Sequence, residues 1–237
     1  MTNIYNTLFS SGKSRQVALL LDPDKGNEVE LNKILEQANR TRISLILVGG
    51  SLIGCDIDGF ILQVKEHTNL PVILFPGSAF QFTPHADAIL LLSLISGRNP
   101  ELLIGSHVQV AMRIKQSGME VIPTGYILVD GGGVTSVQYM SNTMPIPSDK
   151  PDIVVATALA GQQLGLKLIY LEAGSGAKNS VPVELVRQVR SQISIPLVVG
   201  GGLRSARQVD AVFAAGADMV VVGNSVEGNP ALLDELG

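Results

Sequence analysis

The stretch KLIYLEAGSGAKNSVPVELVRQVRSQISIPLVVGGGLRSARQVDAVFAAGADMVVVGN, residues 167–224, decides the fold of this chain. It holds three short apolar runs, at 167–172, 197–199 and 219–222, and glycine follows each of them closely. Between the runs, apolar residues recur every three or four positions. Continuous apolar runs are typical of strands buried on both faces of a parallel sheet, and the longer spacing is typical of amphipathic helices. The stretch therefore predicts repeated βα units.

The same alternation continues back towards the beginning of the 237-residue chain, with no composition shift or polar linker to divide it. Eight strands alternating with helices predict one domain over residues 1–237, an α/β fold of the (β/α)8 or TIM-barrel type. The predicted strands are 17–22, 44–48, 72–75, 88–92, 120–127, 167–172, 197–199 and 219–222. The predicted helices are 28–40, 57–67, 100–117, 152–164, 182–191 and 205–215, with a short one near 230–235.

Two segments depart from the regular pattern. The third crossover, PGSAFQFTPHA at 76–86, is too short and too interrupted by proline for a full helix. We expect this helix to be shortened or replaced by a loop, so that the outer wall is thin there and leaves a side entrance. Residues 130–150 are rich in Gly, Ser, Pro and Asn, which predicts a long loop at the mouth of the fifth strand.

Composition excludes several functional classes. The formal net charge is −4 and no long basic run occurs, which argues against nucleic-acid binding. A single cysteine, Cys55, cannot form an internal disulfide and suits a reducing cytoplasm. The longest apolar stretch is far shorter than the roughly 20 residues that span a bilayer. We expect a cytoplasmic protein without a transmembrane segment.

Glycines follow the last two strands, at the edge where barrels of this type place their ligands. Gly201 and Gly202 follow the seventh strand, and Gly223 with Asn224 follows the eighth. Free backbone N–H groups and a helix N-terminus can bind a phosphate at these two loops. The alternative is that the glycines only permit tight turns.

Acidic residues close two of the predicted strands. Asp22 ends the first, and with Ser51 on the neighbouring loop it could bind Mg²⁺, which takes one or two protein oxygens and completes its shell with water and phosphate. An acid or base role is the other interpretation of Asp22. Asp24 is interpreted as a cap of the following helix. Glu172 ends the sixth strand, where burial is costly unless the carboxylate is paired or functional. General base is the preferred role for Glu172, and a buried salt bridge is the alternative.

Seven motifs spread over nearly the whole chain resemble those of the geranylgeranylglyceryl phosphate synthase family and its bacterial heptaprenylglyceryl phosphate synthase relatives. They are LLLDPDK, LVGGS, LFPGS, TGYILV, LIYLEAGSGA, VVGGGLRS and VVVGNS. The block YLEAGSG together with the two glycine sites is the specific part. It looks like the second of the family's two groups, because the other group has a shorter version of this loop.

The resemblance implies prenyl transfer. A prenyl diphosphate, in the first instance geranylgeranyl diphosphate, would react with the C3 hydroxyl of sn-glycerol 1-phosphate to give an ether lipid precursor and inorganic diphosphate. The resemblance also implies Mg²⁺ as cofactor, a homo-oligomer that is a dimer or a hexamer, and at most a peripheral membrane contact for release of the lipid product. Tyr139, in a polar loop, is a candidate for a subunit contact, with a chance surface aromatic as the alternative.

The same resemblance assigns roles to individual positions. Asp22 and Ser51 match the magnesium positions, Glu172 matches the residue that takes the hydroxyl proton, and Tyr126 matches a tyrosine that lines the reacting prenyl end. The glycerol phosphate site is matched by Tyr170, Leu171, Glu172, Ala173, Gly174, Ser175, Gly176, Gly201, Gly202, Gly223 and Asn224.

Two other functions remain open at the level of sequence. A phosphoribosyl-type isomerase would use Asp22 and Asp130 as opposed acid and base. A phosphate-binding barrel without catalytic activity would retain the fold alone. The length of the prenyl chain cannot be deduced from the sequence, because it depends on which side chain closes the far end of the groove.

Overall fold

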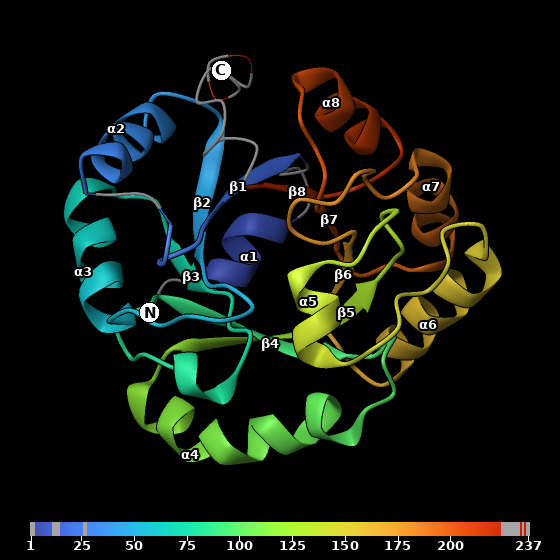
Figure 1. The fold of residues 1–237 in the computed structure, drawn as a ribbon, viewed down its shortest axis with the longest axis horizontal. Coiled ribbons are helices and arrows are strands. Elements are labelled where there is room, and N and C mark those ends of the chain that lie inside the picture. Colours follow the sequence, from blue (N-terminus) through green and yellow to red (C-terminus); the bar gives the residue numbers. More distant parts are fainter. Residues whose placement is uncertain (1–2, 11–14, 26–27, 224–232, 234, 236–237) are drawn as a thin grey trace.

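The eight predicted strands form one closed parallel barrel. The computed structural model describes residues 3–10, 15–25, 28–223, 233 and 235. Figure 1 shows the strands around a common axis, with the larger helices in an outer ring. Each strand pairs in parallel with its sequence neighbours, and β8 pairs with β1. The strands are β1 Gln16–Leu21, β2 Ile43–Val48, β3 Val72–Leu74, β4 Ala88–Leu94, β5 Glu120–Leu128, β6 Leu168–Glu172, β7 Leu197–Gly200 and β8 Met219–Val222.

Six helices of the outer ring were predicted, and five of them follow the predicted ranges to within two residues at either end. Three of the six begin where a side chain or proline suits a helix start: Asp56 accepts from the Asp58 amide before α3, Pro151 opens α6, and Ser205 caps α8. The helices are α2 Glu28–Ala38, α3 Ile57–His67, α4 Ser106–Ser117, α6 Pro151–Gln163, α7 Val183–Gln192 and α8 Ala206–Ala214. The predicted helix near 230–235 falls largely outside the described residues, as does Asn224.

Alternation along the strands divides the core into two layers. One set of strand side chains, including Tyr170 and Val198, points into the barrel, and the other set, including Leu171 and Val199, packs beneath the helices. Both sets are buried because the sheet is covered on both faces. This two-sided burial explains why the strands are so uniformly apolar.

The irregular third crossover is confirmed. Between β3 and β4 the chain forms only a short 3₁₀ turn, η1 Ala79–Gln81, in place of a crossover helix. The long segment after β5 was expected to be a loop throughout, but it contains the short helix α5 Ser136–Ser141 and a bridge between Val129 and Ile146. The predicted helix 100–117 also needs correction, because its first turn is a π-helix, η2 Glu101–Gly105, which leads into α4.

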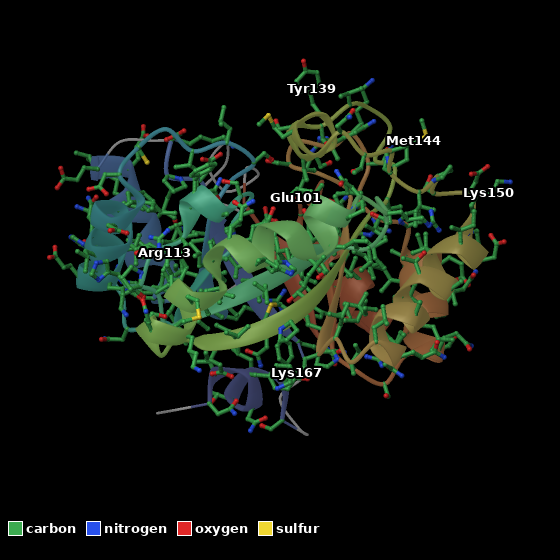
Figure 2. The ribbon with its side chains drawn as sticks, turned by 90° about the horizontal axis from the view of Figure 1, so that it is seen from below. Glu101, Arg113, Tyr139, Met144, Lys150 and Lys167 are labelled. Atoms are coloured by element: carbon green, nitrogen blue, oxygen red, sulfur yellow. The ribbon has the colours of Figure 1, made fainter. Side chains whose placement is uncertain are left out.

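A helix that was not predicted, α1 Ile4–Phe9, closes the N-terminal end of the barrel. Ile4 and Leu8 join the interior core layer, and the Glu120 carboxylate accepts hydrogen bonds from the Ile4 and Tyr5 amides at 2.5 and 3.1 Å. Figure 2 shows α1 and Lys167 at one end of the barrel and Tyr139 at the other. Because α1 blocks the N-terminal end, access to the interior is from the C-terminal ends of the strands.

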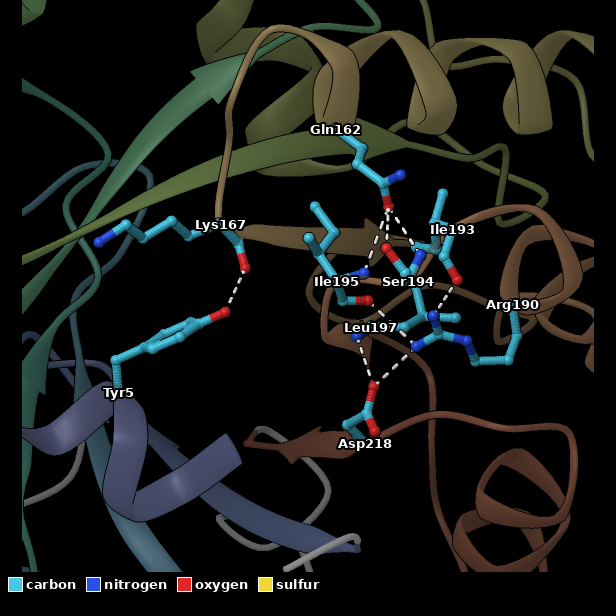
Figure 3. A network of polar contacts seen from close by, with 9 residues as sticks. All are labelled: Tyr5, Gln162, Lys167, Arg190, Ile193, Ser194, Ile195, Leu197 and Asp218. Atoms are coloured by element: carbon cyan, nitrogen blue, oxygen red, sulfur yellow. Dashed lines mark hydrogen bonds and ion pairs between the residues drawn. The ribbon is translucent and has the colours of Figure 1, made fainter. Parts of the chain in front are cut away.

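Polar contacts fasten α6, α7 and β7 to one another at this N-terminal end (Figure 3). Arg190 pairs with Asp218 at 3.0 Å, and the same Asp218 oxygen accepts from the Leu197 amide at 2.8 Å. The Gln162 side chain accepts from the Ser194 and Ile195 amides at 2.7 and 3.2 Å. These contacts hold the start of β7, the strand that leads into the glycine loop.

No helix in the described part of the chain is both long enough and apolar enough to cross a membrane.

Candidate active site

A cavity of about 1570 Å³ opens at the C-terminal ends of the strands, and every strand or its following loop contributes to its lining. Asp22, Ser51, Tyr126 and Glu172 all lie in this lining. The barrel therefore brings together side chains that are up to 150 positions apart in the sequence, from Asp22 to Glu172. The cavity exceeds the roughly 300–1,000 Å³ of an ordinary small-molecule site, so it has room for a long ligand.

Glu172 is the buried acid of the cavity. Its side chain is only 5% exposed, and Oε1 accepts a hydrogen bond of 2.6 Å from the Gly174 amide. Burial raises the pKa of Glu172 to about 7, although the Gly174 amide and the hydroxyls of Tyr170 and Tyr126 oppose this rise. No lysine, arginine or histidine of the described residues forms an ion pair with it, which argues against the salt-bridge alternative. A carboxyl group with a pKa near neutrality suits a general base.

Two tyrosines beside this acid form an aromatic cluster with Phe75. Tyr126 and Tyr170 have ring centroids 5.2 Å apart, and Phe75 lies 5.9 and 5.5 Å from them. Burial, with the nearby charge of Glu172, raises the pKa of both tyrosines well above the usual value, so both hydroxyls stay protonated. The Tyr170 hydroxyl lies beside the Glu172 carboxylate and interacts with it, but it is buried and makes no hydrogen bond of normal geometry with a described residue. It is therefore available to a polar ligand atom beside Glu172.

The glycines after β7 lie directly against Glu172. A Cβ atom on Gly201, whose φ is +80°, would meet Glu172 Oε1 at 2.3 Å, and one on Gly200 would meet the Tyr170 hydroxyl at 2.3 Å. Gly202 also has a positive φ and is pressed against the backbone of Asn179. Only glycine fits these positions. Tight turns alone do not explain these glycines, because the same residues also bring the backbone next to the candidate base.

The loop after β6 contributes to the cavity unevenly. Ser175 and Gly176 line it, whereas the Leu171 and Ala173 side chains point into the core layer beneath the helices. Gly174 has a φ of +102° and lies against Thr135 of the β5–α5 segment. Leu171, Ala173 and Gly174 can therefore meet a ligand only through their backbones. Gly223 lines the cavity after β8, and Asn224 lies beyond the described residues.

Asp22 and Ser51 lie on neighbouring loops of the same cavity. The Asp22 carboxylate pairs with Lys25 at 3.0 Å, and the Cβ position of Gly50 lies 3.3 Å from its Oδ1 atom, so the loop that carries Ser51 packs on this carboxylate. The described residues contain no group of three or more His, Cys, Asp or Glu side chains placed to hold a metal. One carboxylate and one hydroxyl fit Mg²⁺ that takes its remaining ligands from water and a substrate's phosphates.

Asp24 does not cap the following helix, which corrects the sequence interpretation. Its carboxylate accepts from the Gly54 and Cys55 amides at 2.8 and 3.0 Å, and these bonds lower the pKa of Asp24. Helix α2 begins only at Glu28. Asp24 instead fastens the β2–α3 loop to the β1 loop.

Asp130 and Tyr139 lie at the periphery. Asp130 accepts from the Gly132 amide at 2.8 Å, is exposed and does not line the cavity, so it does not oppose Asp22 as the isomerase alternative requires. Tyr139, on α5, is 78% exposed at the cavity mouth. Its role as a subunit contact stays a prediction.

Two contributors were missed at the level of sequence. Phe75 completes the aromatic wall, and Gln81 reaches from η1 to the loop of Ser51. LFPGS carried a signal for Phe75, since the residue ends an apolar strand. Gln81 lies in a segment without periodicity and carried no signal that we can identify.

Comparison with known proteins agrees with this geometry. A geranylgeranylglyceryl phosphate synthase of Chitinophaga pinensis is 46% identical over 98% of this chain and 94% of that protein. One of Spirosoma linguale is 48% identical over 92% of this chain and 88% of that protein. A crystal structure of (S)-3-O-geranylgeranylglyceryl phosphate synthase from Thermoplasma acidophilum contains the substrate sn-glycerol 1-phosphate. That protein is 34% identical to this chain, and the two structures superpose with a TM-score of 0.91. The match covers 100% of this chain and 96% of the other. Residues 12–236 match the sequence profile of the PcrB family, and this chain belongs to that family.

Proposed function

We propose that this chain is a prenyltransferase that joins a prenyl diphosphate, in the first instance geranylgeranyl diphosphate, to the C3 hydroxyl of sn-glycerol 1-phosphate. The observation that carries the proposal is the position of Glu172. This buried acid, with a pKa of about 7, lies between the glycine loops after β6 and β7 and the aromatic wall of the cavity. The relatives named geranylgeranylglyceryl phosphate synthase support the same assignment.

The two halves of the cavity suit the two substrates. Backbone N–H groups near Gly201, Gly202 and Gly223, with the N-terminus of α8 beginning at Ala206, offer donors for the phosphate of glycerol phosphate. Holding the phosphate there presents the glycerol hydroxyl to Glu172. The 1- and 3-phosphates are enantiomers that differ in configuration at C2, so with the phosphate and the terminal hydroxyl both held, only one of them directs its C2 hydroxyl correctly, and stereospecificity follows from that third contact.

The apolar half extends outwards through the barrel wall. Ile89 of β4 belongs to the outer core layer, yet it lines the cavity together with Phe82 and with Val110 of α4. The cavity therefore reaches the space that a third crossover helix would fill. An apolar channel of this kind can hold the prenyl chain away from water.

The reaction balances with these groups. The C3 oxygen of glycerol phosphate forms a bond to C1 of the prenyl group, the bond from C1 to the diphosphate oxygen breaks, and its electron pair leaves with diphosphate. Glu172 accepts the hydroxyl proton as the new bond forms. Asp22 and Ser51 would hold Mg²⁺, which would supply positive charge to the departing diphosphate. Lys25, paired with Asp22 and also in the lining, adds to that charge.

A homo-oligomer and a cytoplasmic location form part of the proposal. Several large apolar side chains around α5 are exposed, which supports self-association: they are Val134, Tyr139, Met140 and Met144. If Tyr139 anchors a contact between copies, Tyr139→Ala lowers the assembly size in light scattering. An unchanged size removes Tyr139 from the interface.

A product assay tests the proposed activity. The purified protein is incubated with Mg²⁺, radiolabelled sn-glycerol 1-phosphate and prenyl diphosphates of several lengths, and lipid is then extracted. We expect labelled product in the organic phase with at least one chain length, and little with sn-glycerol 3-phosphate. Absence of product with every length contradicts the proposal.

A further inference from the structure

Gln81 joins the two loops behind the candidate magnesium site. Its side-chain amide donates to the Gly50 carbonyl at 2.8 Å and accepts from the Gly77 amide at 2.8 Å. Gln81 is only 5% exposed, so both bonds are protected from water. A buried side chain that satisfies one donor and one acceptor on different loops fixes their relative position, because breaking either bond leaves a polar group without a partner.

The loop that Gln81 holds is the one that carries Ser51. A Cβ atom on Gly77 would meet the Gly50 carbonyl oxygen at 2.4 Å, and the Ser51 Cα atom is 3.1 Å from the same position. On its other side, a Cβ atom on Gly50 would lie 3.3 Å from the Asp22 Oδ1 atom. The Gly50–Ser51 backbone is thus held between Asp22 and the β3 loop, and Gln81 is the side chain that ties it to that loop.

The missing third helix explains why such a tie is needed. In place of a crossover helix this unit has only the three-residue turn η1, which ends at Gln81. The turn is itself anchored, since Arg113 of α4 donates to the Phe82 carbonyl at 3.4 Å and lies 4.7 Å from the centre of the Phe82 ring. Through Gln81, the loop of Ser51 is therefore held in place relative to α4. The space that a crossover helix would occupy remains part of the cavity.

We propose that Gln81 is a positioning residue that sets the Ser51 loop opposite Asp22 and so prepares the half of the site that binds magnesium diphosphate. The inference rests on the proposed function, and it concerns the metal and diphosphate half alone. Glycerol phosphate binding depends on the loops after β6, β7 and β8, which Gln81 does not touch by any hydrogen bond of the described residues. The two substrates should therefore respond differently to its removal.

Gln81→Met tests this at nearly constant side-chain length. The substitution leaves the Gly50 carbonyl and the Gly77 amide without partners, so we expect KM for the prenyl diphosphate to rise about tenfold or more while KM for glycerol phosphate stays within about twofold. Calorimetric titration with inorganic diphosphate and Mg²⁺ should show a matching loss of affinity, a readout independent of turnover. Gln192→Ala, at an exposed glutamine of α7, is the control and should match the unmodified enzyme.

Gln81→Glu is the second variant. It keeps an acceptor for the Gly77 amide but places a carboxylate oxygen against the Gly50 carbonyl, so it should lose magnesium diphosphate affinity at least as strongly. Unchanged affinity in both variants overturns the proposal, and so does an equal loss of glycerol phosphate binding, which would indicate general structural damage. If the unmodified enzyme forms no lipid product, the proposed function fails instead, and the diphosphate titration still decides the role of Gln81.

Discussion

The Oε1 atom of Glu172 accepts a hydrogen bond of 2.6 Å from the backbone amide of Gly174, two residues further along the chain. The acid is therefore held by the loop that begins immediately after it. The Gly201 backbone lies close to this bond. A Cβ atom on Gly201 would lie only 2.3 Å from Oε1 and 2.7 Å from the Gly174 nitrogen. Two loops thus meet at one carboxylate, and this meeting point orients the candidate base.

Glu172→Gln should remove most of the turnover and leave glycerol phosphate binding intact. The amide has nearly the same shape but cannot accept the hydroxyl proton, so we expect a loss of about 10²–10⁴-fold in kcat. Single-turnover kinetics give the rate, and calorimetry with sn-glycerol 1-phosphate gives the affinity. Unchanged turnover would remove Glu172 from the mechanism.

The pH profile should report the same group. Burial raises the pKa of Glu172 to about 7, and only the ionised form can accept a proton. We therefore expect kcat/KM to fall about tenfold per pH unit below this pKa and to level off above it. The residual activity of Glu172→Gln should not show this fall in kcat/KM at low pH. A fall that persists in the variant assigns the ionisation to another group.

Gly201→Ala should impair both glycerol phosphate binding and turnover, because the new methyl group displaces Glu172 or the Gly174 amide. Gly165→Ala is the matched control. Gly165 has a similar φ of +88°, but nothing lies within 4 Å of its Cβ position. In both variants, alanine at a positive φ should lower the free energy of unfolding by about 1 kcal/mol or more. Only Gly201→Ala should lose activity, and equal activities would argue that Gly201 has no part in the site.

Asp22→Asn should raise the Mg²⁺ concentration needed for half-maximal activity by about tenfold or more. Asp152→Asn is the control, since Asp152 is an exposed carboxylate in the first turn of α6 and does not line the cavity. Its Mg²⁺ requirement should match that of the unmodified enzyme. Removal of divalent cations with a chelator should stop turnover, and full activity in excess chelator would contradict a metal at Asp22.

Much of the fold could be predicted from local pattern, because each strand is buried on both faces and is therefore apolar at nearly every position. Glu172 stood out for the same reason, as a charged residue that closes such a run. The helix α1 could not be predicted, since six residues carry little periodicity and its amides bond to Glu120, more than a hundred positions away.

The errors at the site share a physical cause. Asp24 precedes a helix, so capping was the natural local interpretation, yet its partners are on the next βα loop. Gln81 likewise acts between two loops that only the closed barrel brings together. Glu172 ends one strand and Asp130 lies just beyond another, but only burial in the folded chain distinguishes the acid inside the cavity from the one outside it.

A crystal structure of this protein with sn-glycerol 1-phosphate tests the central claim most directly. We predict the phosphate at the backbone amides of the Gly201 and Gly223 loops, with the C3 hydroxyl at about 2.6–3.2 Å from the Glu172 carboxylate. A phosphate bound elsewhere in the cavity, or a C3 hydroxyl turned away from Glu172, would contradict the account.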